Sequence, residues 1–157
     1  MRIPNYKVGW IIPAKVAALT HFHSNITEED RMGVFTETQK LLESVQEPFH
    51  IIIDNRYAPL ERFYNLKELQ AFSPFLNHPQ LRSLFIVKPV QLELNQVAGA
   101  PEKSGEVVLI NVDSVTQALA IMSKMVEGMD EWEAKSFFHH SERNNPDDFI
   151  FQKNGGE

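Results

Sequence analysis

Three short apolar runs recur along the chain, and polar or turn-forming residues bound each of them. The runs are Phe49 to Ile53, Leu84 to Val87 and Val107 to Ile110. Short runs without regular alternation are typical of strands that are covered on both faces, as in a parallel sheet. Upstream, Tyr6 to Pro13 and Val16 to His23 are rich in β-forming residues and are separated by a short turn, which predicts an antiparallel hairpin.

Helical patterns alternate with these runs, and each helix is expected to begin at a capping residue. The expected caps are Thr27, Asn65 and Ser114. Apolar stripes at steps of three and four are expected to face a sheet; they are Met32, Phe35, Thr38, Leu41, Leu42 and Val45 in the first helix, Leu66, Leu69 and Phe72 in the second, and Val115, Leu119, Met122 and Val126 in the third. Ser73 and Pro74 are expected to end the second helix.

This alternation predicts an α/β fold with a mostly parallel five-stranded sheet, an antiparallel N-terminal edge strand and helices packed on it. The strand from Val16 to His23 is expected to lie parallel to the three apolar runs. Residues 1–128 are expected to form this domain, and residues 129–157 a C-terminal helical extension with a flexible tail. Whether residues 90–105 form a helix or a loop stays open.

Composition argues against several classes of function. The chain of 157 residues has no cysteine, so thiolate nucleophiles and thiolate metal sites are absent. The net charge of −6, without any basic run, disfavours a nucleic-acid partner. We find neither a signal-peptide pattern nor an apolar stretch approaching ~18 residues, and we expect a cytoplasmic protein without a membrane span. No glycine-rich phosphate loop is present, and no cofactor is expected.

Two histidines of the predicted second strand are candidate metal ligands. His21 and His23 are two apart on the predicted second strand and would therefore point to the same face. A third ligand is missing, because His50 is expected at the opposite end of the sheet. We therefore expect no bound metal.

Polar residues follow the predicted parallel strands at their carboxyl ends, where open α/β sheets bind ligands. Asp54, Asn111 and Asp113 fall at this edge, and Arg56, Tyr57 and Lys88 are expected to join them. Such carboxylates more often cap or turn the chain than catalyse. Because no acid and base pair with an identifiable nucleophile, no catalytic residue is assigned.

Two groups of aromatic residues are candidates for core or for a binding surface. Phe63, Tyr64, Phe72 and Phe75 surround the second helix, and Trp132, Phe137 and Phe138 lie in the C-terminal extension. Helix-spaced aromatic residues usually pack inward, whereas exposed ones form an apolar patch that suits a partner.

Several short segments occur in an order that resembles the bacterial STAS/SpoIIAA-like domains. They are Trp10 to Val16, Ile26 to Asp30, His50 to Asp54, Asn77 to Leu81 and Val112 to Ser114. The resemblance spans roughly residues 6–125 and implies a sheet of about five strands used as a non-catalytic interaction module or, in some relatives, as a binder of lipophilic ligands.

Two departures from that family affect function. Relatives that act as anti-sigma-factor antagonists carry a phosphorylated serine just after the third strand, whereas residues 54–65 contain neither serine nor threonine. A phosphoserine switch at that place is therefore excluded. The second departure is Val90 to Gly105, where relatives carry a longer apolar helix.

The sequence thus predicts a non-enzymatic regulatory domain that binds a protein partner or a second copy of itself. The expected ligand or partner face comprises Asp54, Arg56, Tyr57, Phe63, Tyr64, Phe72 and Lys88, and the expected homodimer interface comprises Trp132, Phe137 and Phe138. The alternative is a small carrier or sensor that holds an apolar, lipid-like ligand between helices and sheet. An enzyme is the third possibility.

Overall fold

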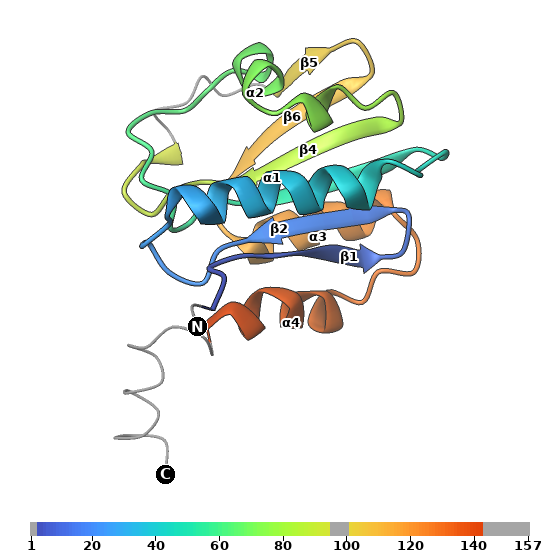
Figure 1. Cartoon of the computed structure of the whole chain (residues 1–157). Helices are drawn as coiled ribbons and strands as arrows, with labels where there is room; N and C mark the ends of the chain where they lie inside the picture. Colours follow the sequence, from blue (N-terminus) through green and yellow to red (C-terminus); the bar gives the residue numbers. More distant parts are fainter. Residues whose placement is uncertain (1–2, 95–100, 143–157) are drawn as a thin grey trace.

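The structure, a computed structural model, describes residues 3–94 and 101–142, the last four as backbone only. Within these residues a single six-stranded sheet has the order β1-β2-β3-β4-β6-β5, and helices cover both of its faces (Figure 1). The strands are β1 (Lys7–Ile12), β2 (Val16–Thr20), β3 (Phe49–Asp54), β4 (Leu81–Val87), β5 (Glu102–Ser104) and β6 (Val107–Val112). The helices are α1 (Glu28–Leu42), α2 (Leu66–Phe72), the 3-10 helix η1 (Pro74–Asn77), α3 (Val115–Met125) and α4 (Glu131–Glu142).

The central strands confirm the predicted parallel sheet. β2, β3, β4 and β6 are parallel neighbours, and β1 pairs antiparallel with β2 at one edge. The prediction of five strands was wrong, because β5 pairs antiparallel with β6 at the other edge. Gly105 adopts φ of +60°, which lets the chain reverse between Ser104 and Val107 in a two-residue turn.

Two segments differ from the sequence-based expectation or lie outside the structure. β2 ends at Thr20, so residues 21–23 are not part of the strand as expected. In the segment left open between helix and loop, residues 90–92 form a turn and a bend, residues 102–104 form β5, and residues 95–100 lie outside the described residues. The expected flexible tail, residues 143–157, is also outside them.

The expected helix caps are all present. The side chains of Thr27, Asn65 and Ser114 accept hydrogen bonds from backbone amides three residues later. These bonds satisfy amide groups that a helix leaves without an internal partner. α2 ends at Phe72, directly before the Ser73-Pro74 pair, as predicted.

The core forms two layers, one on each face of the sheet. On one face, α3 and α4 pack against Ile52 and Phe85, which are fully buried. On the other, α1, α2 and η1 cover Ile51 and Leu84. Among the described residues, no helix combines the length and the apolar character that a membrane crossing requires.

Two residues of the predicted helix stripes, Met32 of α1 and Phe72 of α2, are exposed and were wrongly placed. All four stripe residues of α3 are buried, but Met32 of α1 is 62% exposed. The buried face of α1 instead runs through Asp30, Val34, Thr38 and Leu42, at steps of four. Asp30 is buried because its carboxylate accepts hydrogen bonds from the backbone amides of Asn5 and Thr27. The buried face of α1 therefore includes a polar residue that the apolar pattern did not contain.

Candidate functional site

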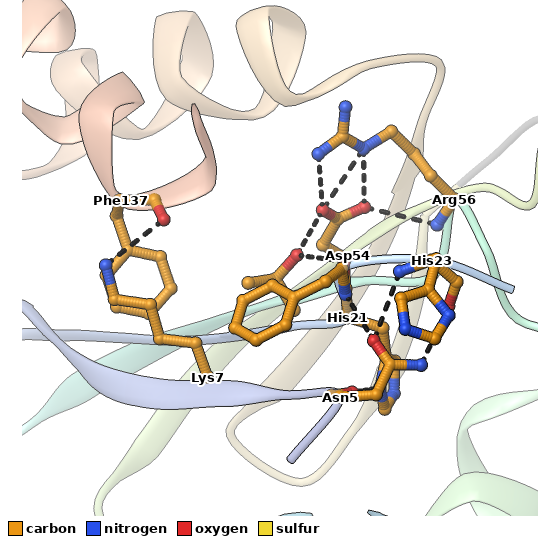
Figure 2. A network of polar contacts seen from close by, with 9 residues as sticks. Asn5, Lys7, His21, His23, Asp54, Arg56 and Phe137 are labelled. Carbon is orange, nitrogen blue, oxygen red and sulfur yellow. Dashed lines mark hydrogen bonds and ion pairs between the residues drawn. The ribbon is translucent and has the colours of Figure 1, made fainter. Parts of the chain in front are cut away.

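The Asp54 carboxylate anchors the carboxyl edge of the parallel strands. It is buried at the end of β3, and Thr20 Oγ1, at the end of β2, donates to Asp54 Oδ2 at 2.6 Å. The Arg56 guanidinium binds the same carboxylate through Nε, at 3.0 and 3.1 Å, and through Nη2, at 2.9 Å (Figure 2). Because both carboxylate oxygens are occupied, Asp54 ties β2 and β3 to the following loop.

A second polar network joins the N-terminal segment to the residues after β2. Asn5 is fully buried; its side-chain oxygen accepts from the amides of Phe22 and His23 at 2.8 and 3.1 Å. Its backbone amide donates to Asp30 Oδ1 at 3.0 Å, which ties the segment to α1. Asn5 therefore fixes the path of the chain just past the end of β2 (Figure 2). In the sequence, Asn5 follows Pro4, a pair that is typical of a turn, and nothing there indicates that Asn5 is buried.

His21 and His23, the candidate metal ligands, form hydrogen bonds within this network. His21 Nδ1 lies 2.8 Å from the carbonyl oxygen of Asn5, and because a carbonyl only accepts, Nδ1 carries the proton. Burial lowers the pKa of His21. His23 Nδ1 accepts from the amide of Asn25 at 3.2 Å. Within the described residues, no group of three histidine, cysteine or acidic side chains is arranged to hold a metal ion.

The structure divides the predicted ligand or partner face between two places. Arg56 and Lys88 line a small pocket at the carboxyl edge of the sheet, on the side covered by α3 and α4. Arg56 also lies against the ring of Tyr57, with 5.4 Å from the guanidinium carbon to the ring centroid. Phe63, Tyr64 and Phe72 belong to the region of α2, which covers the other face.

The pocket at the carboxyl edge, here called the cationic pocket, has a volume of about 190 Å³. Its lining residues are Arg56, Lys88, Val90, Asp113, Ser114, Val115, Thr116, Lys135 and Phe138. Asp113 therefore lies here as the sequence suggested, although its backbone amide is engaged with Gln117 Oε1 at 2.7 Å. Asn111 is one residue short of this edge, paired in register with Ile86. Lys135 of α4 was missed, because only the packing of α4 on α3 and β1 brings it near Arg56 and Lys88, which follow β3 and β4.

The aromatic residues near α2 are only partly buried. Tyr64 and Phe72 meet edge to face, with their ring centroids 5.4 Å apart, and Phe72 is 59% exposed. Arg62 stacks on Tyr64 at 4.1 Å and forms an ion pair with Glu68. Phe75 packs on Phe35 of α1 at 5.8 Å, so it contributes to the core rather than to the surface.

The expected interface on α4 is corrected by its packing. Phe138 is 2% exposed and belongs to the core of its own chain, so it is not available to a partner. Phe137 packs against β1, where Lys7 lies 4.2 Å over its ring and donates to its carbonyl oxygen at 3.3 Å. Gly9 of β1 gives the Phe137 ring room, because a Cβ there would lie 3.3 Å from that ring. Phe137 is half-buried, and Trp132 is 86% exposed.

A groove of about 460 Å³ runs between β1 and α4. Trp10, Ile12, Met129 and Phe137 give it an apolar wall, and charged residues, Lys7 and Glu133 among them, also line it. Its volume lies within the range of about 300 to 1,000 Å³ that is typical of small-molecule sites.

Comparisons with protein-family models, with curated proteins and with solved structures find no match to this chain. The resemblance to STAS/SpoIIAA-like domains therefore stays a prediction.

Proposed function

We propose that this chain is a non-catalytic, STAS-like interaction domain that associates with a second copy of itself through apolar side chains on its helices. The observation that carries the proposal is the exposure of Trp132 on α4 and Phe72 on α2. Each large apolar side chain left in water forgoes about 1.5 to 3 kcal/mol of burial free energy. A partner that covers them recovers this free energy.

The edges of the sheet support association through helices rather than through strands. β5 has only three residues, and its Glu102 and Lys103 are exposed, which discourages pairing with another strand. At the opposite edge, α4 lies beside β1 (Figure 1). The Lys7 side chain of β1 donates to the Phe137 carbonyl oxygen of α4 (Figure 2). The helix faces are therefore the accessible apolar surfaces.

The polar groups near the carboxyl edge support a non-catalytic role. Both oxygens of Asp54 are held by Thr20 and Arg56, and His21 is bound to the Asn5 carbonyl. A catalytic acid or base needs an available proton site aimed at a substrate. These groups instead fix the ends of β2 and β3.

The second candidate function is a carrier of an apolar ligand, and the groove between β1 and α4 is the observation that favours it. Its apolar wall and its volume of about 460 Å³ suit a small ligand. Elsewhere, the space between α3 and the sheet is occupied by Phe85, Leu119 and Met122, all at most 1% exposed. Native mass spectrometry of the purified protein separates the candidates, because it reports both copy number and any retained ligand.

The test of the proposal is molar mass by light scattering across a wide concentration range. We expect a dimer whose dissociation constant rises about 10-fold or more in Trp132→Ser, because exposed tryptophans dominate many interfaces. Phe72→Ser tests in the same way whether the α2 surface contributes to the dissociation constant. Ile3→Ser, at a residue that is 69% exposed, is the matched control. A chain that stays monomeric at the highest concentration contradicts the proposal. Truncation at Gly128 is unsuitable, because it removes Ala134 and Phe138 from the core.

A further inference from the structure

The cationic pocket gathers positive side chains from three separate elements. Arg56 comes from the loop after β3, Lys88 follows β4, and Lys135 comes from α4. Asp113 is the acidic side chain of the lining. The whole chain carries a net charge of −6, so three cations around a cavity of about 190 Å³ run against its overall charge.

These cations differ in how they are compensated. The guanidinium of Arg56 is bound by the buried Asp54 carboxylate, with Nη2 to Oδ2 at 2.9 Å. In the part of the chain that the structure describes, neither Lys88 nor Lys135 is in an ion pair. The Lys88 ammonium has a single long hydrogen bond, 3.4 Å to the Pro89 carbonyl oxygen. Lys88 and Lys135, both half-buried residues, therefore line a common cavity whose lining includes one acidic residue, the exposed Asp113.

We infer that the cationic pocket binds the phosphate group of a small anionic ligand. A phosphate monoester carries about −1.5 to −2 charges at neutral pH and presents three acceptor oxygens. Lysine ammonium groups bind phosphate as compact point charges. The pocket is smaller than the ~300 Å³ typical of a site for a whole drug-sized ligand, so it suits a phosphate-sized group with the rest of the ligand outside.

The apolar lining strengthens this site. Val115 and Phe138 are buried beneath the pocket, and charge interactions are stronger where water is partly excluded. Phe138 lies in the core three residues after Lys135, so the packing of α4 also fixes the helical turn from which Lys135 projects. The site is thus complete within a single copy of the chain and does not depend on self-association.

The test is a titration of the intact, isotope-labelled chain with inorganic phosphate, followed by NMR at constant low ionic strength set with sodium chloride. We expect saturable shifts of the amides of Arg56, Ser114 and Thr116. Lys88→Gln and Lys135→Gln are each expected to weaken binding by about 10- to 100-fold, the loss of a charge-assisted hydrogen bond. Lys124→Gln, at an exposed site late in α3, is the matched control and is expected to leave the affinity unchanged.

Two further measurements keep this test decisive. Lys135→Arg preserves the charge and is expected to retain binding within a few-fold, and unfolding midpoints show whether each variant keeps its fold. Shifts that grow without saturation, or a loss in Lys124→Gln equal to that in the pocket variants, would overturn the inference. Light scattering of Lys88→Gln separates this result from the proposed self-association, because Lys88 follows β4 and lies on neither α2 nor α4.

Discussion

The two helix layers of this protein differ in how completely the predicted apolar stripes of their helices are buried. On the α3 and α4 side, every residue of the predicted α3 stripe is buried, and α4 covers the outer flank of α3. On the α1 and α2 side, the stripe of α1 is buried only in part, and Met32 and Phe72 are exposed. A helix buried against two neighbours must be apolar at each contact, whereas a helix with one neighbour can place apolar residues in water.

The aromatic residues of the two layers differ in burial in the same way. Phe138 of α4 is buried in the core that α3 and α4 form on the sheet, whereas Phe72 of α2 is 59% exposed and meets the ring of Tyr64. Both lie on short amphipathic helices. What separates them is the layer that each helix joins.

The largest expected difference in unfolding free energy is between alanine substitutions of these two phenylalanines. Phe138→Ala is expected to lower the free energy of unfolding by about 3 to 5 kcal/mol, because it leaves a cavity in the core. Phe72→Ala, at an exposed site, is expected to change it by about 0.5 kcal/mol or less. Urea denaturation of both variants measures the difference. Equal losses would show that α4 does not contribute to the core in the way described.

A matched pair of methionines sharpens the comparison between α3 and α1. Met122 is fully buried and Met32 is 62% exposed. Met122→Ala is expected to cost about 2 to 5 kcal/mol of unfolding free energy, and Met32→Ala about 0.5 kcal/mol or less. The measurement is again urea denaturation. A loss of more than 2 kcal/mol of unfolding free energy in Met32→Ala would indicate that Met32 is buried, as the sequence pattern predicted.

The smallest expected effect concerns one histidine in each layer. His21 binds the Asn5 network that holds α1. His50, whose Nδ1 lies 2.6 Å from Ser83 Oγ, is two residues before Ile52 on β3 and so lies on the face that α3 and α4 cover. Burial lowers the pKa of both; the positive charge of Arg82 lowers that of His50 further. The unfolded chain therefore binds more protons below the ordinary histidine pKa of about 6.5, and stability must fall as the pH drops through that value.

Urea denaturation at pH 7.5 and 5.5 measures this effect. Each histidine contributes at most about 1.4 kcal/mol per pH unit to the slope. We expect His50→Gln to reduce the loss of stability on acidification without abolishing it, because His21 still contributes. A slope that His50→Gln leaves unchanged would mean that His50 does not contribute to it.

Much of the fold follows from local patterns. The parallel order of the central strands is indicated by their apolar runs, and the caps Thr27, Asn65 and Ser114 mark where helices begin. The strand β5 was missed because three residues, two of them charged, carry no strand pattern. Its pairing depends on Gly105 and on the exposed edge of β6, which exist only once the sheet is assembled.

The sequence by itself determined the class of fold, the helix starts and the residues Arg56, Lys88 and Asp113 at the carboxyl edge, because these depend on period and on chain neighbours. Only the tertiary structure decided that Lys135 joins them, that Asn5 is buried, and that Phe138 faces inward while Trp132 faces out. Each of these depends on how a distant segment packs, and a burial free energy is set by the neighbour that covers a side chain rather than by the side chain alone.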